Sequence, residues 1–109
     1  LLRRFGDDTV STRSVGNLTL EYGSRKVFRE GKEADLTKTE YDLLELLMRN
    51  ANLVLTRERI YEAIWDYDFE TNSKSLDVYI GYLRRKVDNN PETRLIHTIR
   101  GVGYCLREP

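Results

Sequence analysis

The sequence is short of the residues on which catalytic and metal centres are usually built. Its 109 residues include one cysteine and one histidine. Cys105 has no partner for an internal disulfide, which fits a reducing, cytoplasmic setting. His97 alone cannot build a histidine-based metal cluster or a catalytic triad. Glu40 and Asp42 form a candidate carboxylate pair, but Glu40 also fits a helix cap. We therefore expect no metal, no cofactor and no catalytic residue.

Long apolar runs and net charge are also missing. No run approaches the roughly 20 residues of a membrane-spanning helix, and no signal-peptide pattern opens the chain, so we expect no membrane association. The 18 Lys and Arg residues balance 18 Asp and Glu residues, which argues weakly against nucleic-acid binding. A chain that is 39% hydrophobic and 33% charged suits one soluble globular domain.

The balanced charges are unevenly distributed along the chain. Residues 73–109 carry seven Lys and Arg against four Asp and Glu, whereas residues 33–70 carry four against ten. One interpretation is an ordinary solvated surface. The other is a molecule with two faces, one basic and one acidic, that meet different partners.

The first third of the chain predicts a small sheet behind a linker. Residues 1–14 are polar and lack periodicity, apart from Leu1, Leu2 and Phe5. We interpret them as a linker, with Leu1–Arg4 as the end of a preceding helix in a longer protein. Alternating polar and apolar residues then predict a meander of three strands: residues 17–22, 25–29 and 33–36.

Three helices and a hairpin are predicted to follow. Thr37 and Glu40 have the spacing of a capping box, and Thr56 can cap a second helix. A third helix begins near Ser73, and Asp88–Pro91 end it. The predicted buried stripes are Ile60, Ala63 and Ile64 on the second helix, and Leu76, Ile80, Leu83 and Val87 on the third. Strands at 95–100 and 104–106 flank Gly101–Gly103. Residues 15–109 thus predict an α+β winged helix-turn-helix.

The outer face of the third helix predicts contact with duplex DNA. A helix of about 10–12 Å diameter fits a major groove about 12 Å wide. Lys74, Arg84 and Arg85 are suited to phosphates, which fix register without reading sequence. Val78 lies between Ser75 and Tyr82, where it can touch a thymine methyl. Gly81 either lets the backbone approach another surface or is a neutral position.

Two residues outside that helix have alternative roles. Arg100 precedes the glycines of the hairpin tip, and beside a basic helix we favour a minor-groove contact over an ordinary exposed arginine. Trp65 can donate its indole N–H to a phosphate while its ring packs in the core, but core packing alone is the role we favour.

Four segments, in this order, resemble the effector domain of OmpR/PhoB-type response regulators, the output half of bacterial two-component systems. Leu36–Leu44 is similar to the start of that family's first helix. The other three segments are Val54–Glu58 with Ile64–Trp65 for the second helix, Leu76–Ile80 with Leu83–Lys86 for the recognition helix, and Thr98–Tyr104 for the wing.

The resemblance implies a four-stranded N-terminal sheet and transcription control by head-to-tail pairs bound to direct repeats of duplex DNA. It implies base reading by Val78 and Tyr82, with Lys74, Ser75 and Arg84 nearby. It also implies a wing contact by Arg100, and phosphate contacts by Thr98 and Trp65. The loop from Asp66 to Asn72 corresponds to a segment that touches RNA polymerase in some members. Its acidic and aromatic residues are Asp66, Tyr67, Asp68, Phe69 and Glu70. A receiver domain and a histidine kinase would act upstream.

The chain departs from the family at Gly81 and Tyr82, where some members carry arginines. Arginine-to-guanine readout from these positions is therefore not expected, and the target site should differ. Two other classes of function stay open beside DNA binding. One is a protein-interaction module that docks its partner through Asp66, Asp68 and Glu70. The other, an enzyme, has no supporting site.

Overall fold

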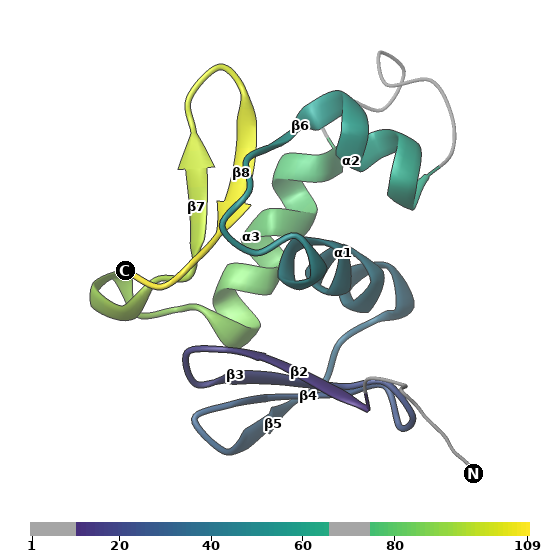
Figure 1. Ribbon diagram of the computed structural model, residues 1–109, viewed down its shortest axis with the longest axis vertical. Helices are drawn as coiled ribbons and strands as arrows, with labels where there is room; N and C mark the ends of the chain where they lie inside the picture. The colour runs from purple at the N-terminus through teal and green to yellow at the C-terminus, as the bar shows by residue number, and fades with distance from the viewer. Residues whose placement is uncertain (1–10, 66–74) are drawn as a thin grey trace, which may run out of the picture.

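A computed structural model describes residues 11–65 and 75–109. The N-terminal part forms an antiparallel four-stranded sheet in which the strands follow chain order. Helices α1 and α3 lie against this sheet, and a β-hairpin projects from the opposite side of the helical layer (Figure 1). The four strands are β2 (Thr12–Val15), β3 (Leu18–Glu21), β4 (Lys26–Arg29) and β5 (Lys32–Ala34).

Alternation of side chains explains why this sheet needs the helices. Leu18 and Leu20 of β3 and Val27 of β4 are buried, because successive residues of a strand point to opposite faces. The predicted meander is confirmed, but the sheet begins earlier than predicted. Strand β2 pairs with β3 from Thr12 onward, so the predicted domain boundary at residue 15 lies inside a strand.

Helix α1 (Lys38–Arg49) begins at the predicted capping box. The Glu40 backbone N–H donates to Thr37 Oγ1 at 3.3 Å, and the Thr37 N–H donates to Glu40 Oε1 at 3.0 Å. Lys86 Nζ of α3 donates to the same Glu40 oxygen at 2.7 Å. The cap therefore also ties the start of α1 to the end of α3. It leaves Glu40 only 3% exposed, with its carboxylate committed to structure.

This arrangement predicts a specific acid sensitivity. Burial raises the pKa of Glu40, but hydrogen bonds from Lys86 and Thr37 outweigh it, and the pKa lies below its ordinary value of 4.5. A carboxyl whose pKa is lower in the folded state stabilises the fold above its ordinary pKa. That contribution is lost as the pH falls through the folded-state value. We expect Glu40→Gln to flatten the decline of unfolding free energy below pH 4.5, measured by urea denaturation at several pH values. Equal slopes for the two proteins would contradict this.

Helix α2 (Arg57–Ile64) begins at the predicted cap, with the Arg59 N–H donating to Thr56 Oγ1 at 3.2 Å. Its predicted buried stripe is partly wrong. Ile60 is buried and Ile64 partly so, but Ala63 is exposed, and Tyr61 is fully buried in its place. The Tyr61 hydroxyl accepts the Leu76 N–H at 2.8 Å, so the core holds a polar anchor for the next helix.

Helix α3 (Ser75–Val87) crosses beneath the other two helices and completes the core. Its predicted stripe is confirmed, since Leu76, Ile80, Leu83 and Val87 are all at most 2% exposed. The short helix η1 (Pro91–Thr93) then leads into the hairpin. Within the two described ranges, no helix combines the length and apolar character needed to cross a bilayer.

The hairpin is the predicted wing, and it has a third strand that the sequence did not reveal. Strands β7 (Ile96–Ile99) and β8 (Gly103–Leu106) are antiparallel, and β6 (Leu55–Thr56) pairs along the other edge of β8. Gly101 has a φ of +75° at the tip, a conformation that favours glycine. The winged-helix fold is thus confirmed, and β6 joins the wing directly to the N-terminus of α2.

Candidate nucleic-acid interface

One strip of α3 is left uncovered by the rest of the fold. Val78 is 48% exposed and Tyr82 is 38% exposed, and Arg85 is exposed beside them. At 100° per residue these positions lie on one side of the helix. A side chain added at Gly81 would meet nothing within 4 Å. We call Val78, Gly81, Tyr82 and Arg85 the reading strip. The predicted contacts Lys74 and Ser75 lie outside the part whose side chains the structure describes.

Arg84 lies beside the reading strip, on the flank of α3 that faces the wing. Its Nη2 donates to the Ile96 carbonyl at 3.0 Å and to Thr98 Oγ1 at 2.8 Å. Burial lowers the pKa of Arg84. Although predicted as a phosphate contact, this guanidinium is engaged with β7. This contact holds the wing against the helix, and Thr98, a second predicted phosphate contact, is the partner of Arg84 in it. The phosphate contacts of both residues stay predictions.

A second attachment joins the wing to α3 two turns earlier. Asp77 accepts hydrogen bonds from the Tyr104 hydroxyl of β8 and from Arg57 Nη1 of α2, the latter at 2.6 Å. We call Arg57, Asp77 and Tyr104 the clasp, because they join α2, α3 and β8. Sequence reasoning missed the clasp, since its members are 20 and 27 residues apart and form no local motif.

The clasp fixes the ionisation of its members. Burial raises the pKa of Tyr104 to about 12, with the hydrogen bond to Asp77 adding to it. Burial also works to raise the pKa of Asp77, but hydrogen bonds from Arg57 and Tyr104 outweigh it and the net change is a decrease. At neutral pH the phenol is therefore a donor and the carboxylate an acceptor, which keeps the clasp closed.

The clasp borders a hollow that also reaches the wing tip. This hollow has a volume of about 310 Å³, and Arg57, Asp77 and the wing residues from Thr98 to Tyr104 line it. Arg100 is exposed at its edge, and Val102 at the tip is 44% exposed. The structure thus brings the predicted wing residue Arg100 to the same side as the start of α3.

The other flank of α3 packs on a row of aromatic rings. The Trp65 ring lies 4.9 Å from Tyr61 and 5.6 Å from Tyr79, measured between centroids. Tyr79 meets Tyr82 edge-on at 5.7 Å, and the Arg85 guanidinium lies over the Tyr82 ring at 5.2 Å. Trp65 is partly buried in this row. The row positions Tyr82, so Trp65 supports the reading strip whether or not its indole meets a phosphate.

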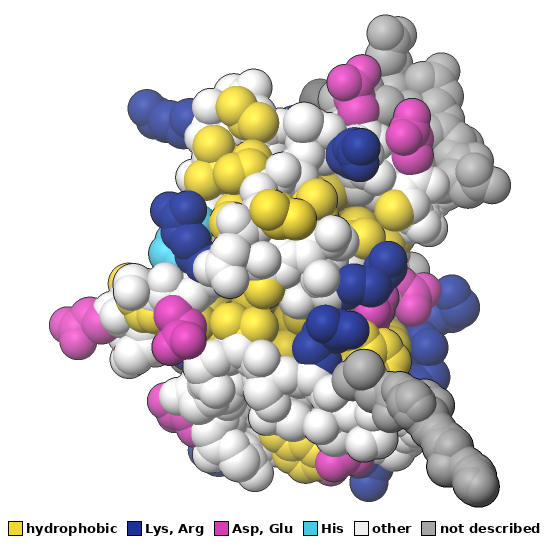
Figure 2. All heavy atoms as spheres, in the orientation of Figure 1, with side chains coloured by type: hydrophobic (Ala, Val, Ile, Leu, Met, Phe, Trp, Pro, Cys, Tyr) yellow, Lys and Arg dark blue, Asp and Glu magenta, His cyan; other side chains and the backbone are white. Residues whose placement is uncertain are grey.

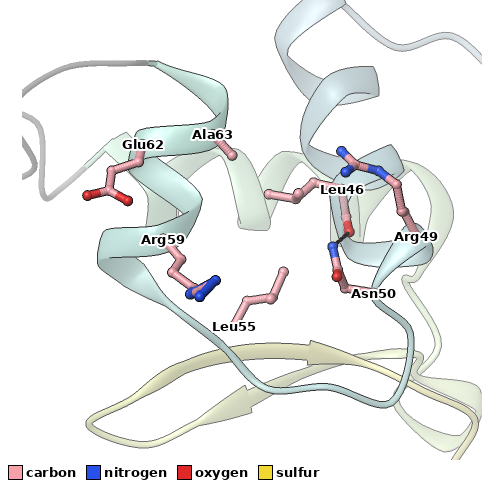
Figure 3. Close-up of a pocket in the computed structure, with 7 residues that line it drawn as sticks. All are labelled: Leu46, Arg49, Asn50, Leu55, Arg59, Glu62 and Ala63. Atoms are coloured by element: carbon pink, nitrogen blue, oxygen red, sulfur yellow. Dashed lines mark hydrogen bonds between the residues drawn. The ribbon is translucent and has the colours of Figure 1, made fainter.

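The largest of the described pockets lies elsewhere, between α1 and α2. It has a volume of about 400 Å³ and shares no lining residue with the hollow beside the wing. Leu46 and Ala63 point into it, while Glu62 points away (Figure 3). It brings together no nucleophile and base, and no group of three or more His, Cys, Asp or Glu in the described ranges is placed to hold a metal ion.

Charge on the molecular surface is mixed where Figure 2 shows it. Acidic side chains lie at the α2 end of this face, with a basic one beside them, and also toward its left edge and lower rim (Figure 2). Other basic side chains are interspersed with hydrophobic ones across its middle. The acidic residues Asp66, Asp68 and Glu70, with Tyr67 and Phe69, lie outside the described residues. Their predicted contact with a polymerase therefore stays a prediction.

Comparison with known proteins identifies a family and several relatives to which this chain is similar. The family described as "Transcriptional regulatory protein, C terminal" matches residues 31–106. Response regulator MprA of Mycobacterium leprae (strain TN) is 50% identical over 111 residues, which cover 99% of this chain and 49% of that protein. Response regulator MprA of Mycobacterium sp. (strain KMS) is 54% identical over 92 residues, 84% of this chain and 40% of that protein. The chain thus spans about half the length or less of these relatives.

Solved structures with the same fold come from two further bacteria. The Klebsiella pneumoniae RstA DNA-binding domain, in complex with the RstA box, superposes with a TM-score of 0.81 at 27% identity, covering 90% of this chain and 98% of that chain. DrrB, a Thermotoga maritima OmpR/PhoB homologue, superposes with a TM-score of 0.79 at 31% identity, covering 89% of this chain and 44% of that chain. The chain therefore belongs to the family of C-terminal domains of transcriptional regulatory proteins, and within it to the OmpR/PhoB-type response regulators.

Proposed function

We propose that this chain binds duplex DNA sequence-selectively, with α3 in the major groove and the wing tip at the adjacent minor groove, and so regulates transcription. The observation that carries the proposal is the exposed reading strip. Both flanks of α3 are fixed, one by the clasp and Arg84 and the other by the aromatic row. A helix held rigidly on both sides with one uncovered face is suited to recognise the edges of base pairs.

Electrostatics supports the same orientation. Arg85 on the strip and Arg100 on the wing are exposed cations on elements that flank one hollow. Each is placed to meet a phosphate or the electronegative floor of a narrow minor groove. The zero net charge of the chain does not oppose binding, because the acidic surplus lies in residues 33–70 and outside α3 and the wing.

A matched pair of arginine variants tests the proposal. Arg100 and Arg107 are both exposed, but Arg100 is at the wing tip and Arg107 follows β8. We expect Arg100→Ala to weaken binding to a duplex selected from a random pool by about 1–3 kcal/mol, measured by fluorescence anisotropy. Arg107→Ala removes the same charge away from the tip and should change affinity little. Equal losses of affinity in the two variants would show that Arg100 contributes only nonspecific electrostatic attraction, and that the wing tip makes no special contact.

The clasp gives a second prediction about the same contact. If Tyr104 and Asp77 set the position of the wing, the affinity lost on Arg100→Ala should be smaller in a Tyr104→Phe background. Such a cycle isolates coupling between the two sites. Tyr22→Phe is the matched control, since its hydroxyl also donates to a carboxylate, that of Glu45 at 2.8 Å, but far from the wing. Additive effects for Tyr104 and Arg100 would rule out the positioning role.

We propose that the chain is the output domain of a two-component response regulator, coupled to a receiver domain and a histidine kinase in the cytoplasm. We also propose head-to-tail pairing on direct repeats, and contact of residues 66–70 with RNA polymerase, with no catalytic step in this domain. A change of Asp66, Asp68 and Glu70 to alanine should then reduce activated transcription and leave DNA affinity unchanged. Loss of DNA affinity in that variant would contradict the assignment of polymerase contact to residues 66–70 and of DNA binding to α3 and the wing.

A further inference from the structure

Val102 is an apolar side chain at a place where hairpins usually carry glycine or polar residues. It follows Gly101 at the tip of the wing and is 44% exposed. A single exposed valine on a protein surface is ordinary. This one differs in having a backbone fixed on both sides and a position at the border of two hollows, beside the exposed cation of Arg100.

The backbone of Val102 is hydrogen-bonded through both of its polar groups. Its N–H donates to the Ile99 carbonyl at 2.9 Å and closes the turn at the wing tip, and its carbonyl accepts the Arg57 N–H at 3.2 Å. Arg57 is the first residue of α2, so the tip is tied to that helix as well as to its own hairpin. The direction of the Val102 side chain is therefore set by the fold before a partner binds.

Val102 borders two hollows on the surface. It lines the hollow of about 310 Å³ beside the clasp, and a second hollow of about 320 Å³ that Thr56, Arg57 and Glu58 of the α2 N-terminus also line. Minor-groove-binding proteins insert apolar side chains into that groove, which is about 6 Å wide and has a sugar–phosphate wall on each side. A fixed apolar side chain with a hollow on either side matches that cross-section.

The floor of the minor groove differs between base pairs by one polar group. An A·T pair presents only acceptor atoms there, whereas a G·C pair adds the N2 amino donor of guanine. Valine has no acceptor in its side chain, so a guanine amino group against Val102 would lose water without gaining a hydrogen bond, which is costly. Arg100 on the same tip carries only donors, which suit the acceptors of an A·T pair.

Resting on the proposed DNA binding, we infer that Val102 contacts the floor of the minor groove beside Arg100 and selects against guanine at that base pair. Recognition there is by exclusion of the guanine amino group. It is distinct from the contribution of Arg100, whose charge is attracted to any narrow, electronegative groove. Val102 is therefore a specificity-determining residue of the wing, in addition to the reading strip on α3.

Inosine isolates the effect of the guanine amino group. An inosine·cytosine pair has the major-groove edge of G·C but lacks the N2 amino group, so its minor groove resembles that of A·T. In a duplex selected from a random pool, each A·T pair is replaced in turn by G·C and by inosine·cytosine, and affinity for the parent chain is measured by fluorescence anisotropy. At one pair we expect G·C to weaken binding about tenfold, and inosine·cytosine to bind within about twofold of the A·T duplex.

Val102→Thr tests the side chain itself. Threonine has the shape of valine, but its hydroxyl can accept a hydrogen bond from the amino group. We expect the difference between G·C and inosine·cytosine to fall to about threefold or less in this variant, with affinity for the A·T duplex little changed. Val54→Thr makes the same chemical change at a valine that is 45% exposed and lies before β6, and it should keep the full difference. Thermal unfolding checks that both variants are folded.

The outcomes separate this inference from the proposed function. Selective binding in which no A·T pair distinguishes G·C from inosine·cytosine would overturn the inference alone. An undiminished difference in Val102→Thr would also overturn it, because the preference would then belong to Arg100 or to the width of the groove. If the parent chain selects no duplex from the pool, the proposed function fails and the inference fails with it.

Discussion

Gly103→Ala should destabilise the fold by about 3 kcal/mol or more, or abolish cooperative unfolding altogether. A Cβ at this position would lie 1.9 Å from the Leu55 carbonyl oxygen and 2.9 Å from the carbonyl carbon. Both atoms belong to backbone that cannot rotate away as a side chain can. Gly103 pairs with Thr56 in the β6–β8 ladder, so alanine must push the two strands apart.

The destabilisation caused by Gly103→Ala should extend from the wing to α2, because Thr56 is also the N-cap of that helix. Urea denaturation followed by circular dichroism measures the loss, and Gly23→Ala, where the added Cβ meets nothing within 4 Å, is the matched control. We expect that control to lie within about 0.5 kcal/mol of the parent chain. Similar stabilities for the two variants would show that the close approach of β6 to β8 is not obligatory.

The second large effect is expected at Asp88, which is 2% exposed just past the end of α3. Its carboxylate accepts the Leu95 and Ile96 backbone N–H groups at 2.8 and 2.9 Å, and Arg29 Nη1 at 3.0 Å. Arg29 in turn donates to the Val87 carbonyl at 2.6 Å. This one carboxylate thus joins the N-terminal sheet, the end of α3 and the start of β7.

Asp88→Ala should lower the free energy of unfolding by about 3–5 kcal/mol, because it leaves a partly buried guanidinium and two backbone donors without their acceptor. Glu92→Ala, four residues on and exposed, removes the same charge without those contacts and should change stability by at most about 0.5 kcal/mol. Guanidinium chloride is unsuitable because it screens ion pairs, so urea melts should be compared. Equal effects of the two substitutions would reduce the role of Asp88 to that of an ordinary surface charge.

These two residues show where sequence patterns stop being informative. Asp88 followed by Asn89, Asn90 and Pro91 predicts only the end of a helix, and it does end one. Its partners Arg29 and Leu95 come from other elements, and nothing in the pattern indicates them. Gly103 was interpreted as a residue of a tight hairpin tip, whereas the structure gives it a place in β8 against a strand of only two residues. Long-range contacts of this kind depend on the packed fold.

The local features were predictable for physical reasons. The capping box at Thr37 and Glu40 and the 3,4-spaced stripe of α3 are set by helix geometry alone, and both are confirmed. The exposure of Val78 and Tyr82 follows from the same periodicity. Arg84 shows what helix periodicity cannot predict. Periodicity places this residue beside the reading strip, but it does not indicate that its guanidinium is hydrogen-bonded to β7. Tyr79 and Trp65 likewise become neighbours only once α2 packs against α3.

Selective recognition of base pairs by the reading strip is the central property proposed for this domain. The most direct measurement compares the affinity of the parent chain for its pool-selected duplex with its affinity for a duplex in which three of the selected positions are changed, at one fixed salt concentration. At about 1–3 kcal/mol for each changed position, we predict a ratio of at least about a hundred. A ratio near one, with the domain folded, would contradict selective recognition. Such binding would be electrostatic attraction to phosphates, and α3 would not be a reading helix.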